Sequence, residues 1–281
     1  MGSPADVSYE TVTYTEADGV ATVTLNRPDK YNAFNITMLR EVRDIWRLLR
    51  RHDDVRCIVL TGAGDKAFCT GIDRMEQMED GPTGAAAGGE PYIGFGATPF
   101  HFDDPGEWLG PKSNDLWKPV IAAVNGMACG GAFYMLGEVE FIIAAEHAAF
   151  FDPHVTYGMC ATFEPLQMID RMPFGELMRM SLMGNYERIS AQKAMDIGLV
   201  TEVVPGEELA AAAQHCAAAI ASAPALAVEG TVRSIWAGRE LGRTQALSMG
   251  AGLVALGTSD ASLAEGQAAF SSGKRIDWRL R

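Results

Sequence analysis

Two glycine-containing loops hold the residues of this sequence that are best suited to bind a ligand through backbone. The first is Ala67-Phe-Cys-Thr-Gly-Ile-Asp73, and the second is Asn125-Gly-Met-Ala-Cys-Gly-Gly-Ala132. Gly130 and Gly131 lack a Cβ atom, so a ligand can approach the backbone closely there. The next residues, Ala132-Phe-Tyr-Met-Leu136, predict a helix whose first N–H groups are unpaired and carry the positive end of its dipole. The second loop is therefore either an anion site or an ordinary glycine turn that lets a strand and a helix pack tightly.

One histidine stands in a segment where acid–base chemistry could use it. His154 lies in Phe150-Phe-Asp-Pro-His-Val-Thr-Tyr-Gly158. An unperturbed imidazole titrates near pH ~6.5, which suits a general acid or base at neutral pH. The competing interpretation is a structural histidine that is hydrogen-bonded to the backbone.

Short apolar strands have to position these loops. Alternation and β-branching predict a strand at residues 20–25, and continuous apolar runs predict strands at 57–61, 120–124 and 141–145. Apolar residues at i, i+3, i+4 and i+7 spacing predict a helix across residues 38–49. Apolar strands that alternate with helices indicate a buried, largely parallel sheet. The predicted fold class is therefore α/β.

The chain divides by composition into two regions. Residues 1–205 hold the predicted core with the ligand site, and residues 206–281 are predicted to be helical. The helices expected in the second region span residues 207–222, 225–237, 244–257 and 260–271. Because this region is too short for a large core of its own, we expect it to pack against a neighbouring subunit. Residues 75–118 show no hydrophobic period, and a connection of that length predicts a flap that shapes the substrate pocket.

Composition excludes several classes of partner. The formal net charge is −13 over 281 residues, and no cluster of Lys and Arg outweighs it, so neither nucleic acid nor a membrane surface is expected. No apolar stretch reaches the ~18 residues of a membrane span, and the first ten residues show no secretory signal. Five cysteines without a CxxC pair predict reduced thiols and a cytoplasmic location. No metal site is predicted.

Five motifs follow one another in a fixed order along the chain. They are Asn26-Arg-Pro with Asn32-Ala33; Ala67 to Asp73; Lys118-Pro-Val-Ile-Ala-Ala-Val-Asn-Gly126 followed by Gly130-Gly131; Arg188-Ile-Ser-Ala-Gln192 with Gly198-Leu-Val200; and Glu265-Gly-Gln-Ala-Ala-Phe270 with Lys274-Arg275. Together they make nearly the whole chain resemble the crotonase (enoyl-CoA hydratase/isomerase) superfamily. The resemblance implies a spiral of ββα turns with a C-terminal helical trimerisation region, assembled as a homotrimer or a hexamer. It also implies an acyl-CoA substrate, with coenzyme A as part of the substrate and no separate cofactor.

The resemblance further implies an oxyanion hole made by the backbone N–H groups of Ile72 and Gly131. Proton abstraction beside a thioester, or addition to its conjugated double bond, places negative charge on the carbonyl oxygen. Loss of one preorganised donor to such an oxygen typically costs ~3–4 kcal/mol. The residues implied in binding the CoA part are Ala67, Thr70, Gly71, Asp73 and Gly130, together with Phe270 and Lys274 from a neighbouring subunit. Lys274 lies one residue later than the family spacing.

Two positions depart from the family pattern. Hydratases of this family use two glutamates, and the corresponding positions here hold Tyr134 and His154. Two carboxylates hold and activate the water that hydrates an enoyl thioester, so Tyr and His cannot act by the same arrangement. Tyr134 is either an acid or a packed aromatic residue. Glu164, in a loop that the family places beside the pocket, is either the residue that orients His154 through its second ring nitrogen or a surface carboxylate that opens the next helix. Asp152 is the alternative to Glu164 as a partner for His154, although the alternation of side chains along a strand favours an Asp152 side chain that points away from His154.

Three hypotheses for the function follow. The leading one is an enzyme of the enoyl-CoA hydratase/isomerase type, with His154 as the base and Tyr134 as a candidate acid. The second is a crotonase-like hydrolase that cleaves a C–C bond of a β-diketone with His154 and Glu164. The third is an acyl-CoA-binding protein without catalysis.

Overall fold

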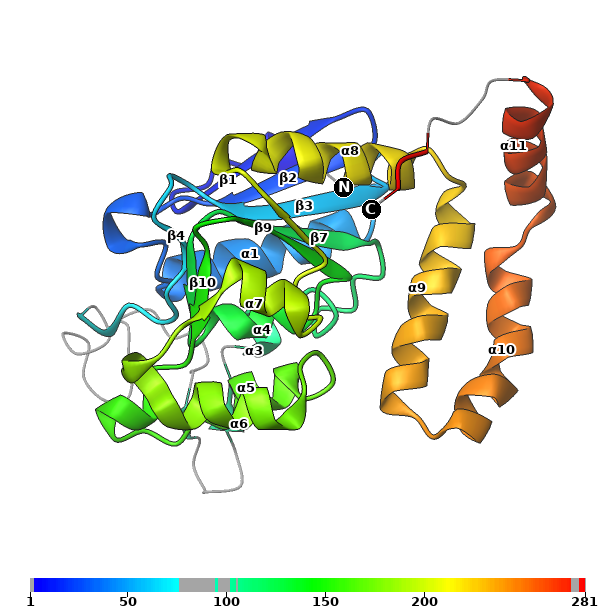
Figure 1. Ribbon diagram of the computed structural model, residues 1–281. Helices are drawn as coiled ribbons and strands as arrows, with labels where there is room; N and C mark the ends of the chain where they lie inside the picture. Colours follow the sequence, from blue (N-terminus) through cyan, green and yellow to red (C-terminus); the bar gives the residue numbers. More distant parts are fainter. Residues whose placement is uncertain (1–2, 76–93, 96–101, 105, 274–277, 281) are drawn as a thin grey trace.

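Two β-sheets form the body of the protein, as the computed structural model in Figure 1 shows. The structure describes residues 3–75, 94–95, 102–104, 106–273 and 278–280. The strands of the larger sheet follow the order β1 (Val12–Ala17), β2 (Val20–Leu25), β3 (Cys57–Gly62), β7 (Val120–Val124), β9 (Phe141–Ala145) and β12 (Glu202–Val204). β1 and β2 are antiparallel, and each later neighbour is parallel. The predicted parallel sheet is confirmed.

The second, smaller sheet has four strands, and the carboxyl ends of three of them lie together at one edge. Its order is β11 (Ile189–Ser190), β10 (Ala149–Phe151), β8 (Met127–Cys129) and β4 (Ala67–Cys69). β10, β8 and β4 are parallel, whereas β11 is antiparallel to β10. Each of the three parallel strands follows a strand of the larger sheet along the chain, and β8 and β10 are each followed by a helix. This repeat is the predicted spiral of ββα turns. Apart from these sheets, β5 (Gly94–Phe95) pairs with β6 (Phe102–Asp103).

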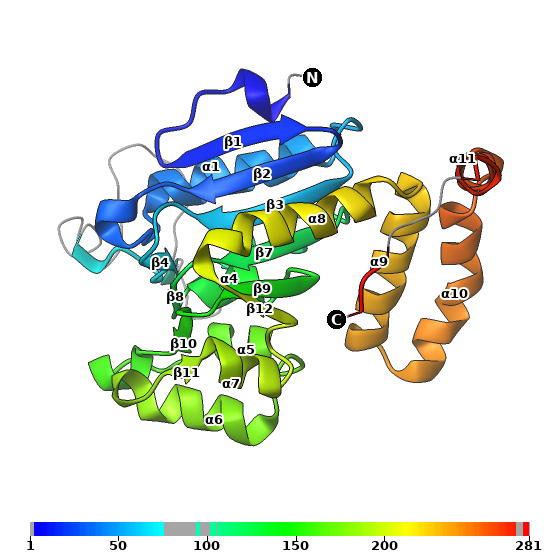
Figure 2. The ribbon, with the colours of Figure 1, turned by 45° about the horizontal axis from the view of Figure 1, so that its top comes forward.

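Helices cover both faces of the larger sheet. α1 (Ile36–Leu49) begins after Asn35, whose side chain accepts a hydrogen bond from the Met38 N–H at 3.0 Å, and its apolar stripe enters the main core. α8 (Leu209–Ala221) lies across the other face, as Figure 2 shows. Its buried face is largely alanine, which lets this helix approach the strands closely.

The remaining short helices surround the smaller sheet or connect strands. The α-helices among them are α3 (Gly106–Leu109), α4 (Ala132–Leu136), α5 (Phe163–Met168), α6 (Phe174–Met183) and α7 (Ala191–Asp196). The 3-10 helices are η1 (Pro4–Asp6), η2 (Pro28–Lys30), η3 (His154–Tyr157), η4 (Gly184–Tyr186) and η5 (Gly206–Glu208). α4 is the helix predicted after Gly131.

Three C-terminal helices lie at one end of the molecule, beside the sheets (Figures 1 and 2): α9 (Ala225–Glu240), α10 (Arg243–Gly257) and α11 (Asp260–Ser271). α9 and α10 pack against each other over their length. Large apolar side chains remain exposed on all three, namely Leu226, Ile235, Leu247, Met249, Val254, Leu256, Leu263 and Phe270. Such a surface is typical of a face that another chain covers.

The structure also bears on the other predictions for the chain. The strands at 120–124 and 141–145 and the helix at 260–271 have the predicted bounds, whereas β4 and β8 lie in segments that we expected to be loops.

Residues 76–93 and 96–101 of the predicted flap lie outside the described residues. Among the described helices, none alone has the length and hydropathy to cross a membrane; one bent pair, residues 206–221 with 225–240, meets both criteria.

Candidate active site

The candidate site lies where the parallel strands of the smaller sheet end. β4 leads into Thr70-Gly71-Ile72, β8 leads into Gly130-Gly131, and β10 leads into Asp152-Pro153-His154. Because the three strands are parallel neighbours, their carboxyl ends meet at one edge and bring the three loops together. The loops border one cavity of about 250 Å³.

The first two loops touch each other through backbone atoms. A Cβ built on Gly71 would lie 3.0 Å from the Gly131 nitrogen, and one built on Gly131 would lie 2.5 Å from the buried ring of Phe34. Gly71 has a φ of +84°, which favours glycine. These contacts explain why glycine occupies both positions.

Two backbone N–H groups at this contact, those of Ile72 and Gly131, make no hydrogen bond to the described residues. Phe34 donates to the Gly71 carbonyl and accepts from the Asp73 N–H, each at 2.8 Å. Since N–H groups alternate in direction along an extended segment, the Ile72 N–H faces away from Phe34. Within the part of the chain that the structure describes, neither the Ile72 N–H nor the Gly131 N–H donates a hydrogen bond.

His154 is held by a fully buried carboxylate. Asp152 Oδ1 lies 2.5 Å from His154 Nδ1 and also accepts from the His154 backbone N–H at 3.0 Å. The Asp152 side chain is 0% exposed, and its Oδ2 has no hydrogen-bond partner among the described residues. This hydrogen bond raises the pKa of His154 above its ordinary value, against the opposing effect of burial. It also directs Nε2 away from Asp152.

Glu164 faces the other nitrogen of the imidazole ring. Its Oε1 lies 3.3 Å from His154 Nε2, and burial raises the pKa of the Glu164 carboxyl. The predicted contact of Glu164 with the second ring nitrogen is therefore present. The expectation that Asp152 points elsewhere was wrong, because β10 ends at Phe151 and the strand alternation does not continue to His154.

Tyr134 lies on α4 and borders the same cavity. Burial raises the pKa of its phenol, and the nearby carboxyl groups of Glu164 and Asp104 raise it further. The hydroxyl therefore keeps its proton and is suited to donate a hydrogen bond rather than to act as a base.

Most of the predicted site residues share this cavity. Those that line it are Thr70, Gly71, Ile72, Gly130, Gly131, Tyr134, His154 and Glu164. Ala67 and Asp73 do not line it. Ala67 is buried in β4, where its carbonyl accepts from Asn32 and Asn125, and Asp73 forms an ion pair with Arg27 at 2.9 Å.

The two remaining predicted residues belong to the C-terminal region. Phe270 is 90% exposed on α11, and both views place α11 at the opposite end of the molecule from β4 and β10 (Figures 1 and 2). Lys274 lies outside the described residues.

A sequence signal for Asp152 existed. An Asp before Pro favours a turn in which the carboxylate accepts from the backbone two residues on, and the bond from the His154 N–H to Asp152 is of this kind. Arg74 also lines the cavity, and nothing in the sequence apart from its place after Asp73 pointed to it.

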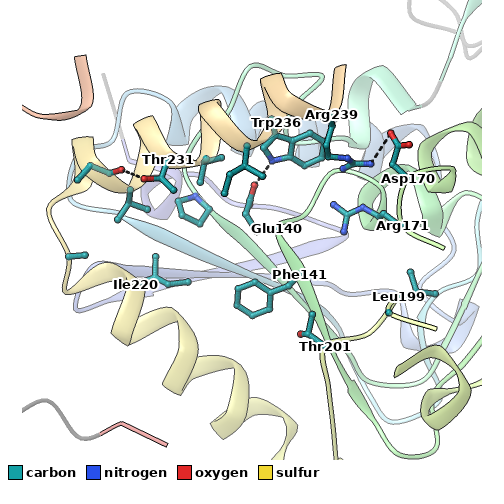
Figure 3. Close-up of a pocket in the computed structure, with 17 residues that line it drawn as sticks. Glu140, Phe141, Asp170, Arg171, Leu199, Thr201, Ile220, Thr231, Trp236 and Arg239 are labelled. Carbon is teal, nitrogen blue, oxygen red and sulfur yellow. Dashed lines mark hydrogen bonds and ion pairs between the residues drawn. The ribbon is translucent and has the colours of Figure 1, made fainter. Parts of the chain in front are cut away.

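A larger cavity of about 750 Å³ lies between α9 and the larger sheet (Figure 3). Its polar groups engage one another: Trp236 Nε1 donates to Glu140 at 2.8 Å, and Arg239 lies 3.7 Å from Asp170. Apolar groups such as Phe141 form much of the rest. No histidine is among the described residues that line this larger cavity.

No group of three or more His, Cys, Asp or Glu residues in the described ranges is arranged to hold a metal ion.

Comparison with known proteins identifies the family. A sequence model described as enoyl-CoA hydratase/isomerase matches residues 15–94 and 102–281. The chain belongs to the enoyl-CoA hydratase/isomerase family. The predicted superfamily and fold class are confirmed, and so is the prediction of an enzyme of this type.

Curated relatives within the enoyl-CoA hydratase/isomerase family are named for more than one reaction. The chain is 34% identical over 231 residues to an (E)-benzylidenesuccinyl-CoA hydratase of Thauera aromatica, covering 82% of this chain and 84% of that protein. It is 36% identical over 208 residues to a 1,2-epoxyphenylacetyl-CoA isomerase of Escherichia coli, covering 73% and 74%. The crystal structure of an enoyl-CoA hydratase/isomerase from Mycobacterium paratuberculosis superimposes with a TM-score of 0.83 at 35% identity, covering 98% of this chain and 100% of that one.

Proposed function

We propose that this enzyme moves a proton in an acyl-CoA thioester by way of an enolate. One observation carries the proposal: the free N–H groups of Ile72 and Gly131 and the Nε2 of His154 belong to residues that border the same cavity. An enolate needs donors for its oxygen and a base for its carbon. The names of the relatives, which include hydratases and an isomerase acting on CoA thioesters, support the same class of substrate.

In the proposed reaction the thioester carbonyl oxygen accepts hydrogen bonds from the Ile72 and Gly131 N–H groups. His154 Nε2 removes a proton from the carbon beside the carbonyl, and the electron pair of that C–H bond moves toward the oxygen. The two donors stabilise the negative charge, and they require no reorganisation because backbone fixes them. If a proton from solvent returns to the same carbon, the result is hydrogen exchange with solvent. If a proton is added to another carbon conjugated with the enolate, the double bond shifts and the substrate is isomerised.

His154 and Glu164 share the proton balance of the site. With Nδ1–H donated to Asp152, the neutral ring presents the Nε2 lone pair toward Glu164. That lone pair is compatible with a protonated Glu164, and a charged ring is compatible with an ionised Glu164. The two groups therefore titrate as a coupled pair that shares a proton, and the pKa of each is raised above its ordinary value. The base is the form of the pair in which Nε2 carries no proton.

The C-terminal helices are proposed to complete the site in an oligomer, as a homotrimer or a hexamer. The exposed apolar side chains of α9, α10 and α11 support an interface with another copy. Because α11 lies far from the cavity of its own chain, Phe270 would cover the nucleotide end of CoA in a neighbouring subunit (Figure 1).

Solvent-deuterium exchange followed by mass spectrometry tests the proposal. The purified enzyme is incubated in D₂O with saturated acyl-CoA, enoyl-CoA, 3-oxoacyl-CoA and β-diketone compounds. Deuterium at the carbon beside the thioester, or conversion of an enoyl-CoA to a hydroxyacyl-CoA or to a shifted double bond, is the expected result. Cleavage of a diketone without CoA would indicate a C–C hydrolase instead, and no exchange with any compound would contradict catalysis through an enolate.

Replacement of Asp152 with Asn is expected to shift the pH dependence of exchange. The hydrogen bond to Asp152 raises the pKa of His154, so its loss lowers that pKa and moves the rising limb of kcat/KM to lower pH. At neutral pH we expect the rate to fall roughly tenfold or more, because Asn does not hold the same tautomer. Rates measured between pH 5 and 9 check this, and an unchanged limb would show that His154 is not the group that titrates.

A further inference from the structure

Arg74 is a cation on the wall of the candidate active site. It lines the cavity together with His154 and Glu164. Its guanidinium lies over the ring of Tyr157, 4.4 Å from the ring centroid, and one terminal nitrogen donates to the sulfur of Met159 at 3.0 Å. These two contacts fix the direction of a long side chain that would otherwise be free to rotate.

The guanidinium of Arg74 has few good acceptors within the protein. A guanidinium presents five N–H donors in a planar fork, and a thioether is a weak acceptor. No carboxylate among the described residues forms an ion pair with Arg74, whereas Arg27 and Arg179 each have one, Asp73 at 2.9 Å and Glu187 at 2.6 Å. Arg74 also lies close enough to His154 for its charge to lower the pKa of the imidazole. Its charge therefore acts inside the reaction cavity.

We propose that the acyl group of the substrate carries a free carboxylate in addition to the thioester, and that Arg74 binds this carboxylate. This inference rests on the proposed function, since it places the thioester carbonyl on the Ile72 and Gly131 N–H groups. A carboxylate matches the planar fork of arginine with two parallel hydrogen bonds. The phosphates of CoA are the other anions of the substrate. The pantetheine arm separates them from the thioester, so they do not share a cavity of about 250 Å³ with the reacting carbons.

Matched pairs of thioesters test this inference. Each pair has the same number of acyl carbons, but one member ends in a carboxylate and the other in a methyl group. The pairs are succinyl- with butanoyl-CoA, glutaryl- with pentanoyl-CoA, and adipyl- with hexanoyl-CoA. Calorimetry gives the Kd of each thioester, and of free CoA, for the wild-type enzyme and for Arg74→Met and Arg74→Lys. Arg43→Met is the matched control, because Arg43 stacks on Trp108 at 4.3 Å as Arg74 stacks on Tyr157 but does not line the cavity.

We expect at least one dicarboxylic thioester to bind the wild-type enzyme about tenfold more tightly than its uncharged match, as a charge-assisted pair would give. The ratio falls to about one in Arg74→Met, is partly retained in Arg74→Lys, and is unchanged in Arg43→Met. The inference would be overturned if the Kd of the uncharged thioester divided by that of its dicarboxylic match were near one for all three pairs in the wild type. It would also be overturned if this ratio were the same in Arg74→Met as in the wild type. Equal weakening of every thioester and of free CoA in Arg74→Met would assign Arg74 to the CoA phosphates instead.

The same titrations separate this inference from the proposed function. If the uncharged thioesters bind and exchange deuterium while the binding ratio is near one, only the carboxylate contact is wrong. If no thioester binds or exchanges, the proposed function fails as well.

Discussion

Replacing His154 with Gln is expected to slow deuterium exchange into an acyl-CoA by about 10²–10⁴-fold, the usual contribution of a general base. Gln is close to His in size and keeps a polar group toward Asp152, so the fold should survive the change. It cannot accept a proton from carbon at neutral pH. Exchange rates measured by mass spectrometry, with the thioester saturating, report the loss directly.

The control for this variant is His215→Gln. His215 is exposed on α8, on the face of the larger sheet away from the smaller one, and the change should leave the exchange rate within twofold of the wild type. Both variants should show the wild-type Kd for thioesters, because the proposed carbonyl donors are backbone groups. If His154→Gln kept its exchange rate within about tenfold of the wild type, the histidine would be a structural residue.

The fold could be predicted from the sequence where the signal is local. The runs at 120–124 and 141–145 are buried on both faces, and a continuous apolar run of that length indicates such a strand. β4, β8 and β10 have three residues each, and their pairing joins segments that lie far apart in the chain. A three-residue segment carries too little pattern to predict a strand, so the smaller sheet became visible only in the structure.

The site could be predicted as a set of residues but not as a hydrogen-bonding network. The family resemblance placed Ile72, Gly131, Tyr134, His154 and Glu164 in one pocket, and they do border one cavity. The role of the residue two positions before His154 could not be read from alternation, because the chain leaves the strand there and turns at a proline. The position of Arg74 against Tyr157 depends on a tertiary contact between the segment after β4 and η3, for which the sequence gives no local signal.

Replacing Gly71 with Ala is expected to lower the exchange rate by about 10²–10³-fold, the typical cost of losing an oxyanion donor. The new methyl group would lie 3.0 Å from the Gly131 nitrogen, so it would either cover that N–H or push the two loops apart. Ala at a φ of +84° is also strained, which should lower the free energy of unfolding by about 1–2 kcal/mol. A loss of activity alone would therefore be ambiguous between a blocked donor and a weakened fold.

Gly198 resolves that ambiguity, because it has nearly the same backbone conformation in a different setting. Its φ is +83°, and a Cβ built on it meets no atom within 4 Å. Gly198→Ala should therefore show the same loss of about 1–2 kcal/mol in urea unfolding and an exchange rate close to that of the wild type. If both variants lost activity equally, strain rather than a blocked N–H would explain the result. If Gly71→Ala kept full activity, the Gly131 N–H would not contact the reacting thioester, since a methyl group at 3.0 Å leaves no space for an oxygen on the same side.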